Sequence, residues 1–206
     1  MQRRAVLAAL LAAFPLTRLR ADARSDRAAA FIEEKGRALV AVIDSDASVA
    51  EKRARVAAIL REAVDVRGVG QFVLGRHWRT ASEAERAEFL RLFEETLVRN
   101  LSARFGELKG VTFAVGRAQP RGEEGVMVAT TVDRPGQPPV ALDWLVAEVD
   151  GHPRIVDLVA EGTSLRITQR SEYGSVIQRG GGRLDALLEA MRRQLSQLEA
   201  RGLAAN

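Results

Sequence analysis

The chain has 206 residues, with 31 lysines and arginines against 27 aspartates and glutamates, and it contains no cysteine. The lack of cysteine excludes a disulfide framework, a thiolate metal site and a cysteine nucleophile. Most of the formal net charge of +4 comes from residues 1–23, which hold four arginines and one aspartate and leave +1 for the rest. The charge balance therefore does not indicate a nucleic-acid partner, and we expect none.

The N-terminal segment is typical of an export signal. Arg3 and Arg4 precede an apolar run from Ala5 to Leu16, and a small-x-small site follows at residues 21–23. The run of about 12 residues is shorter than the roughly 20 that cross a bilayer, so we expect a cleaved signal peptide over residues 1–23. The paired arginines also resemble a twin-arginine signal, which leaves both that route and the general secretory route open.

Residues 24–206 are enough for one domain with a real core, and helical periodicity dominates their first half. The longest predicted helix starts at a capping box, formed either by Ser82 with Glu85 or by Thr80 with Glu83. The remaining helices of this half are shorter. The pattern predicts helices over residues 26–43, 49–63 and 82–105, with a short helix and turn at 68–75.

The apolar period then changes from 3.6 to two, which indicates strands. Alternation and turn residues predict strands over 111–115, 126–132, 140–146 and 154–159. Helical spacing returns over 165–177 and again over 184–198, after the glycines at 180–182. Helices, a run of strands and helices again predict an α+β domain, with an antiparallel sheet of about four strands covered by helices.

Residues with catalytic or metal-binding chemistry are sparse. His77 and His152 are the only histidines and do not form a ligand spacing, and no nucleophile elbow or phosphate-binding glycine loop is present. We therefore expect no metal, no cofactor and no enzymatic activity. A site built from distant carboxylates leaves no local pattern, so a small-ligand enzyme stays an alternative, as does a plain protein-interaction module.

Apolar side chains are instead spread over both the helices and the strands. Most of them are expected to form an ordinary packed core. Trp78 stands out because residues 75–79 place this ring among positive charges just before a helix. It either lies near a lipid headgroup or anchors the start of the helix, with Arg76 and Arg79 in solvent.

The stretch FVLGRHWRTASEAERAEFLRLFEETLVRNL at residues 72–101 resembles the MlaC or toluene-tolerance family, in which Leu-Gly-aromatic-Trp-Arg precedes a Phe-rich helix. Trp144 on a strand, the segment RIVDLVAEGTSL at 154–165 and QRSEY at 169–173 follow in the family's order. The resemblance covers nearly all of residues 24–206. Two departures are His77, where tyrosine is common, and the segment after Leu101.

The resemblance implies a periplasmic lipid carrier with an apolar pocket. Its expected partners are a phospholipid, an outer-membrane lipoprotein complex and an inner-membrane ABC transporter with an MCE-domain subunit. A hopanoid is an alternative cargo, because some relatives occur with hopanoid biosynthesis. The residues that we expect to face the lipid tails are Val73, Leu74, Trp78, Phe93, Leu97, Val128, Trp144, Val146 and Tyr173.

Overall fold

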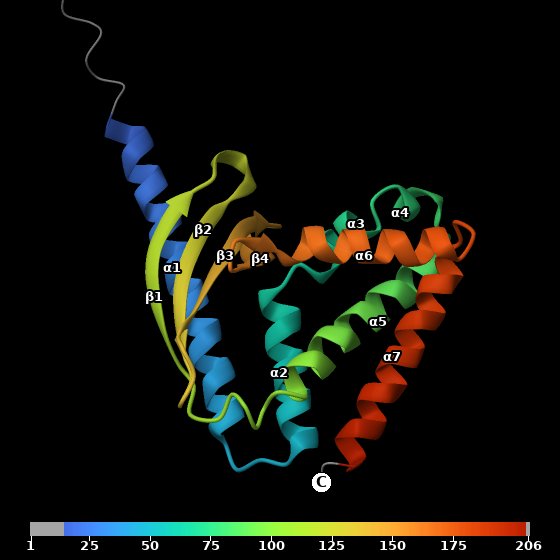
Figure 1. Cartoon of the computed structure of the whole chain (residues 1–206). Coiled ribbons are helices and arrows are strands. Elements are labelled where there is room, and N and C mark those ends of the chain that lie inside the picture. The colour runs from blue at the N-terminus through green and yellow to red at the C-terminus, as the bar shows by residue number, and fades with distance from the viewer. Residues whose placement is uncertain (1–14, 205–206) are drawn as a thin grey trace, which may run out of the picture.

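The computed structural model describes residues 15–204, with the side chains of residues 23–200. Five helices precede a sheet and two follow it (Figure 1). Their bounds are α1 Pro15–Asp44, α2 Val49–Ala63, α3 Val66–Leu74, α4 Arg76–Thr80, α5 Glu83–Ser102, α6 Leu165–Arg179 and α7 Leu184–Ala204. The predicted α+β class is confirmed.

Helix α1 begins earlier than the predicted helix at 26–43. Part of the predicted signal segment lies outside the described residues, and 15–23 form the first turns of α1. Among the side chains described, from residue 23 on, the first buried ones of α1 are Ser25 and Ala28. None of the described helices is both long enough and apolar enough to cross a membrane.

Capping boxes mark the starts of α2 and α5. Of the two boxes predicted for α5, the one formed by Ser82 and Glu85 is present. Ser82 Oγ accepts a hydrogen bond from the backbone N–H of Glu85, and the Glu85 carboxylate accepts one from the backbone N–H of Ser82 at 2.7 Å. Helix α5 ends at Ser102, earlier than predicted, and Phe105 follows it in a turn. The short helix predicted at 68–75 is α3, and the prediction missed α4, which Gly75 separates from α3 through its positive φ of +53°.

The predicted antiparallel meander is confirmed, with a fifth strand of two residues added at its edge. Val128 on the second strand pairs with Trp144 on the third strand. The Trp144 indole donates a hydrogen bond to Thr130 Oγ1 at 2.9 Å. The strands lie in sequential order: β1 Thr112–Pro120, β2 Val126–Asp133, β3 Val140–Val149, β4 His152–Ala160 and β5 Thr163–Ser164.

The buried side chains form separate clusters. The helical core joins α3, α4, α5, α6 and α7 around Phe89, Leu92 and Ile177, all of which are almost fully buried. The sheet core joins α1 to the inner face of the sheet around Phe31, Val128 and Val146. Figure 1 shows the same division, with α1 behind the strands and α5, α6 and α7 on the other side of the molecule. A smaller cluster of Ile43, Val56 and Phe105 lies where α1, α2 and the segment after α5 meet.

Candidate functional site

A hollow of about 340 Å³ lies where α5, α6 and α7 meet. Figure 1 shows α5 and α7 both running downward from the right-hand end of α6. Polar and apolar side chains share its wall. The lining residues are Thr96, Asn100, Gln169, Glu172, Tyr173, Val176, Leu187, Ala190, Met191 and Gln194.

Tyr173 lines this hollow and packs against two phenylalanine rings of the helical core. Phe89 and Phe93 stack with their centroids 5.6 Å apart, and Tyr173 meets them edge-on at 6.0 and 6.4 Å. Such edge-to-face pairs add to the stability that burial gives. Burial, and to a smaller extent the charge of Glu172, raises the pKa of Tyr173, so its hydroxyl is neutral at physiological pH. Tyr173 therefore contributes an uncharged aromatic ring to the wall of the hollow.

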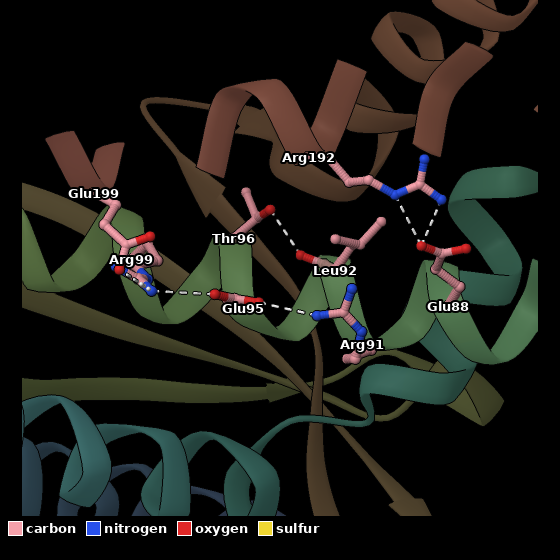
Figure 2. A network of polar contacts seen from close by, with 8 residues as sticks. All are labelled: Glu88, Arg91, Leu92, Glu95, Thr96, Arg99, Arg192 and Glu199. Atoms are coloured by element: carbon pink, nitrogen blue, oxygen red, sulfur yellow. Dashed lines mark hydrogen bonds and ion pairs between the residues drawn. The ribbon is translucent and has the colours of Figure 1, made fainter. Parts of the chain in front are cut away.

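Ion pairs join α5 to α7 at two positions along these helices (Figure 2). Near the start of α5, Glu88 accepts from Arg192 at 2.6 and 2.9 Å. Near its end, Arg99 lies 3.2 Å from Glu95 and 3.5 Å from Glu199. The Glu88–Arg192 pair is partly exposed, and such pairs contribute little stability, so it orients the two helices without locking them together.

Thr96 lies between these two ion pairs. Its hydroxyl donates to the backbone carbonyl of Leu92 at 2.7 Å, as Figure 2 shows, so the hydroxyl hydrogen is already used. The buried threonine therefore presents its methyl group and oxygen lone pairs to its surroundings. The methyl group of Thr96 makes the wall of the hollow less polar. Asn100 and Gln194 are polar residues that also line it.

A second, much smaller hollow lies beside the sheet core. Its volume of about 30 Å³ corresponds to the space of a single water molecule. Ala28, Val126 and Val146 are among its lining residues. It is too small for an organic ligand in this conformation.

The nine predicted tail-facing residues divide between the two large cores. Three of them belong to the sheet core, with Val128 and Val146 inside it and Trp144 packed against it. Tyr173 alone among the nine lines the larger hollow. The six in or against the helical core are Val73, Leu74, Trp78, Phe93, Leu97 and Tyr173.

The sequence prediction missed most of the lining residues because many are polar. On α6 they recur as Gln169, Glu172, Tyr173 and Val176, a spacing of three and four that places them on one helix face. A search restricted to apolar residues does not detect such a face. The equivalent face of α7, at 187, 190, 191 and 194, has the same spacing and is mostly apolar.

Trp78 anchors the start of α5. The ring is buried in the helical core, and the guanidinium of Arg86 lies 5.5 Å from its centroid. Arg86 also donates to the backbone carbonyls of Trp78 and Arg79 at 2.8 and 3.2 Å. Arg76 and Arg79 are exposed, as the anchoring interpretation of this segment expected.

Within residues 23–200, no group of three or more histidine, cysteine, aspartate or glutamate side chains is placed to hold a metal ion. His77 is half-buried, and burial together with the adjacent Arg76 lowers its pKa. The larger hollow combines aromatic and aliphatic side chains with amide and carboxylate groups.

Comparison with known proteins agrees with this architecture. Residues 33–193 match the family model described as MlaC protein. The solved structure of a phospholipid-binding protein from Ralstonia solanacearum, in complex with a phospholipid, superposes with a TM-score of 0.75 at 21% sequence identity, over 84% of this chain and 98% of that one. The structural match shows that the two chains share a fold. Because the family model covers most of the sequence, this chain belongs to the MlaC family, which is a family of carriers and not of enzymes.

Proposed function

We propose that this chain is a periplasmic shuttle that carries phospholipid between an outer-membrane lipoprotein complex and an inner-membrane ABC transporter with an MCE-domain subunit. Membership of the MlaC family is the observation that carries the proposal. The Ralstonia protein of the same fold holds a phospholipid, and the hollow between α5, α6 and α7 supplies a place for lipid tails in this chain.

The energetics of lipid transfer explain why a carrier is needed. Two acyl chains contain roughly 30 methylene groups, and exposing each one to water costs about 0.8 kcal/mol. The total exceeds 20 kcal/mol, so free lipid monomers do not cross an aqueous compartment at a useful rate. A protein that buries the tails as a bilayer does makes extraction nearly neutral, and it needs no covalent chemistry.

The size of the hollow constrains how the lipid enters. A cavity of about 150 Å³ accommodates the six carbons of benzene, or roughly 25 Å³ per carbon. At that density the hollow of about 340 Å³ holds the carbons of about one tail, and two tails need about twice the space. We therefore propose that α5, α6 and α7 spread apart on loading and that further residues of the helical core, Phe93 and Leu97 among them, then contact the tails.

The three predicted lipid-tail contacts that lie in the sheet core need a further movement in this proposal. Val128, Trp144 and Val146 pack against α1 and its neighbours, so lipid reaches them only if α1 also moves. The helical core is the more accessible site, because a hollow is already present there.

Native mass spectrometry of the exported, purified protein tests the proposal. We expect a co-purified phospholipid, and we expect Val176→Glu to lose it while Val176→Ala retains it. Val176 is half-buried and lines the hollow, so a carboxylate there faces polar neighbours and solvent instead of a closed core.

Each other outcome of that measurement contradicts the proposal in a specific way. A bound hopanoid would replace the phospholipid as cargo, and turnover that depends on an ionisable pair would favour the enzyme alternative. A chain that never carries lipid and binds only protein would favour the interaction module. N-terminal sequencing of the same sample tests the predicted start near Arg24.

A further inference from the structure

Two arginines on α6 share one aromatic ring on α3. The guanidinium carbons of Arg166 and Arg170 lie 4.6 and 5.1 Å from the centroid of the Phe72 ring. Arg170 also reaches the end of α3, because its Nη2 lies 3.0 Å from the position that a Cβ at Gly75 would take. Glycine at this position therefore leaves room for the guanidinium.

The carboxylate of Asp157 lies beside Arg166. Asp157 is buried, and its Oδ2 lies 3.3 Å from Arg166 Nε. The same carboxylate already accepts hydrogen bonds from Ser164 Oγ at 2.6 Å and from the backbone of Leu158 and Arg166 at 2.8 and 3.1 Å. The 3.3 Å approach is not aligned as a hydrogen bond, and Arg166 Nε is buried without a hydrogen-bond partner.

The cluster therefore carries surplus positive charge. Within residues 23–200, Arg170 forms no ion pair with a carboxylate, and Arg76 follows Gly75 directly in the chain. Packing of a cation on an exposed ring contributes only about 0.5–1 kcal/mol, and two like charges four residues apart on a helix repel each other. Packing on Phe72 leaves most of the guanidinium donors unused.

Two apolar residues flank Arg166 in the chain. Leu165 and Ile167 are 45% and 58% exposed, and they are two of the three large exposed hydrophobic side chains among the described residues. Paired guanidinium groups bind phosphate oxygens through two parallel hydrogen bonds, a geometry that lysine does not offer. A phosphate next to apolar surface is the arrangement that a phospholipid presents.

We propose that Arg166 and Arg170 bind the phosphate of a lipid headgroup, so that the carrier selects a phosphate-bearing lipid over a neutral one. The proposal rests on the lipid-carrier function and adds its cargo specificity. The phosphate could also come from free inorganic phosphate, and the two sources are separated by experiment.

The test compares two lipids that differ in the phosphate group. Phosphatidylglycerol and diacylglycerol with identical acyl chains are offered to the exported protein in neutral detergent micelles, and bound lipid is counted by native mass spectrometry. We expect the wild type to prefer phosphatidylglycerol by about tenfold or more, which corresponds to about 1.4 kcal/mol. Arg170→Gln should lose this preference and keep its uptake of diacylglycerol.

Two matched variants control the measurement. Arg179→Gln removes an exposed arginine from the last turn of the same helix and should keep the preference. Arg170→Lys retains the charge but not the planar donors, and it should keep only part of the preference. Thermal melting of each variant checks that the domain is folded, which we expect because Arg170 is exposed.

The remaining outcomes separate the two proposals. Preference unchanged in Arg170→Gln overturns the phosphate assignment and leaves the carrier intact. Failure of the wild type to bind either lipid overturns the carrier function itself. Calorimetric titration with inorganic phosphate is the last arm: Arg170-dependent binding of phosphate, with lipid preference unchanged, would make free phosphate the ligand.

Discussion

Val146 and Val176 have the same side chain in two different surroundings, and this contrast decides how each tolerates a charge. Val146 is 4% exposed and packs in the sheet core, whereas Val176 lines the larger hollow. We expect Val146→Glu to lose several kcal/mol of a typical 5–15 kcal/mol stability, because it places a carboxylate in the apolar sheet core. Urea unfolding should show a much smaller loss for Val176→Glu.

The two alanine variants control for side-chain size in this comparison, since each removes apolar contacts without adding charge. A Val146→Glu protein that stays folded but carries no lipid would contradict this expectation. It would show that the space between the sheet and α1 opens to solvent and holds acyl chains. Val146 would then be a tail contact, as its strand position first indicated.

His77 links stability to pH. Its folded-state pKa lies below the ordinary value of 6.5, first because of burial and second because of Arg76. The unfolded chain therefore binds the proton more tightly, so the contribution of His77 to stability is present above pH 6.5 and is lost as the pH falls through the lower folded-state pKa. Urea midpoints at pH 7.5 and 5.5 should differ less in His77→Gln than in the wild type.

His152 provides the matched control, because it is exposed at the start of β4. The same two urea midpoints are measured for His152→Gln. An equally large reduction in both variants would mean that His77 has no specific role. The carboxylates of the two capping boxes, Glu51 and Glu85, have lowered pKa values and titrate in a more acidic range than this comparison covers.

At the scale of elements, the contact between α1 and the sheet depends on a glycine in the middle of the helix. A Cβ at Gly36 would lie 2.7 Å from Cε2 of Phe113 on β1. Helix propensity alone would make Gly36→Ala stabilising by about 1 kcal/mol, but this overlap forces the ring or the helix to move. We expect a net loss of stability, measured by urea unfolding, from Gly36→Ala.

The double variant Gly36→Ala with Phe113→Leu distinguishes the two effects. If the clash dominates, the smaller side chain should recover part of the loss that Gly36→Ala causes, so that the two changes are not additive. Additive losses would instead show that the stability lost in Gly36→Ala comes from another contact of α1. The position also explains why a glycine is found within a helix of this length.

The elements could be predicted where the pattern is local and long. Phe89, Phe93 and Leu97 repeat with the helical period of α5, and the strands alternate with period two, so both were found from the sequence. Helix α4 has five residues and β5 has two, which is too short for any period to appear. The larger hollow could not be predicted, because three helices far apart in the sequence meet there and polar residues such as Gln169 line it.

At the scale of the whole molecule, the helical core and the sheet core are separate, so lipid binding should change the hydrogen-exchange protection of one core more than that of the other. A ligand that binds only the folded state stabilises it by about 2.7 kcal/mol at a hundredfold excess over Kd. If the tails fill the space between α5, α6 and α7, the amides of these helices that exchange by local opening should become more protected. Amides of α1 and β1 that exchange in the same way should change little. Hydrogen exchange of lipid-loaded and delipidated protein measures this difference.

Val176→Glu is the control for that experiment, because it should show the same exchange pattern with and without added lipid. Equal protection of α1 and β1 would contradict a site confined to the helical core, since it would require the tails to lie between the two cores. Protection confined to α5, α6 and α7 would have a mechanistic consequence. Loading and release would then involve lengthening of the ion pairs Glu88–Arg192 and Arg99–Glu199, together with separation of the apolar contacts that α5 and α7 share in the helical core.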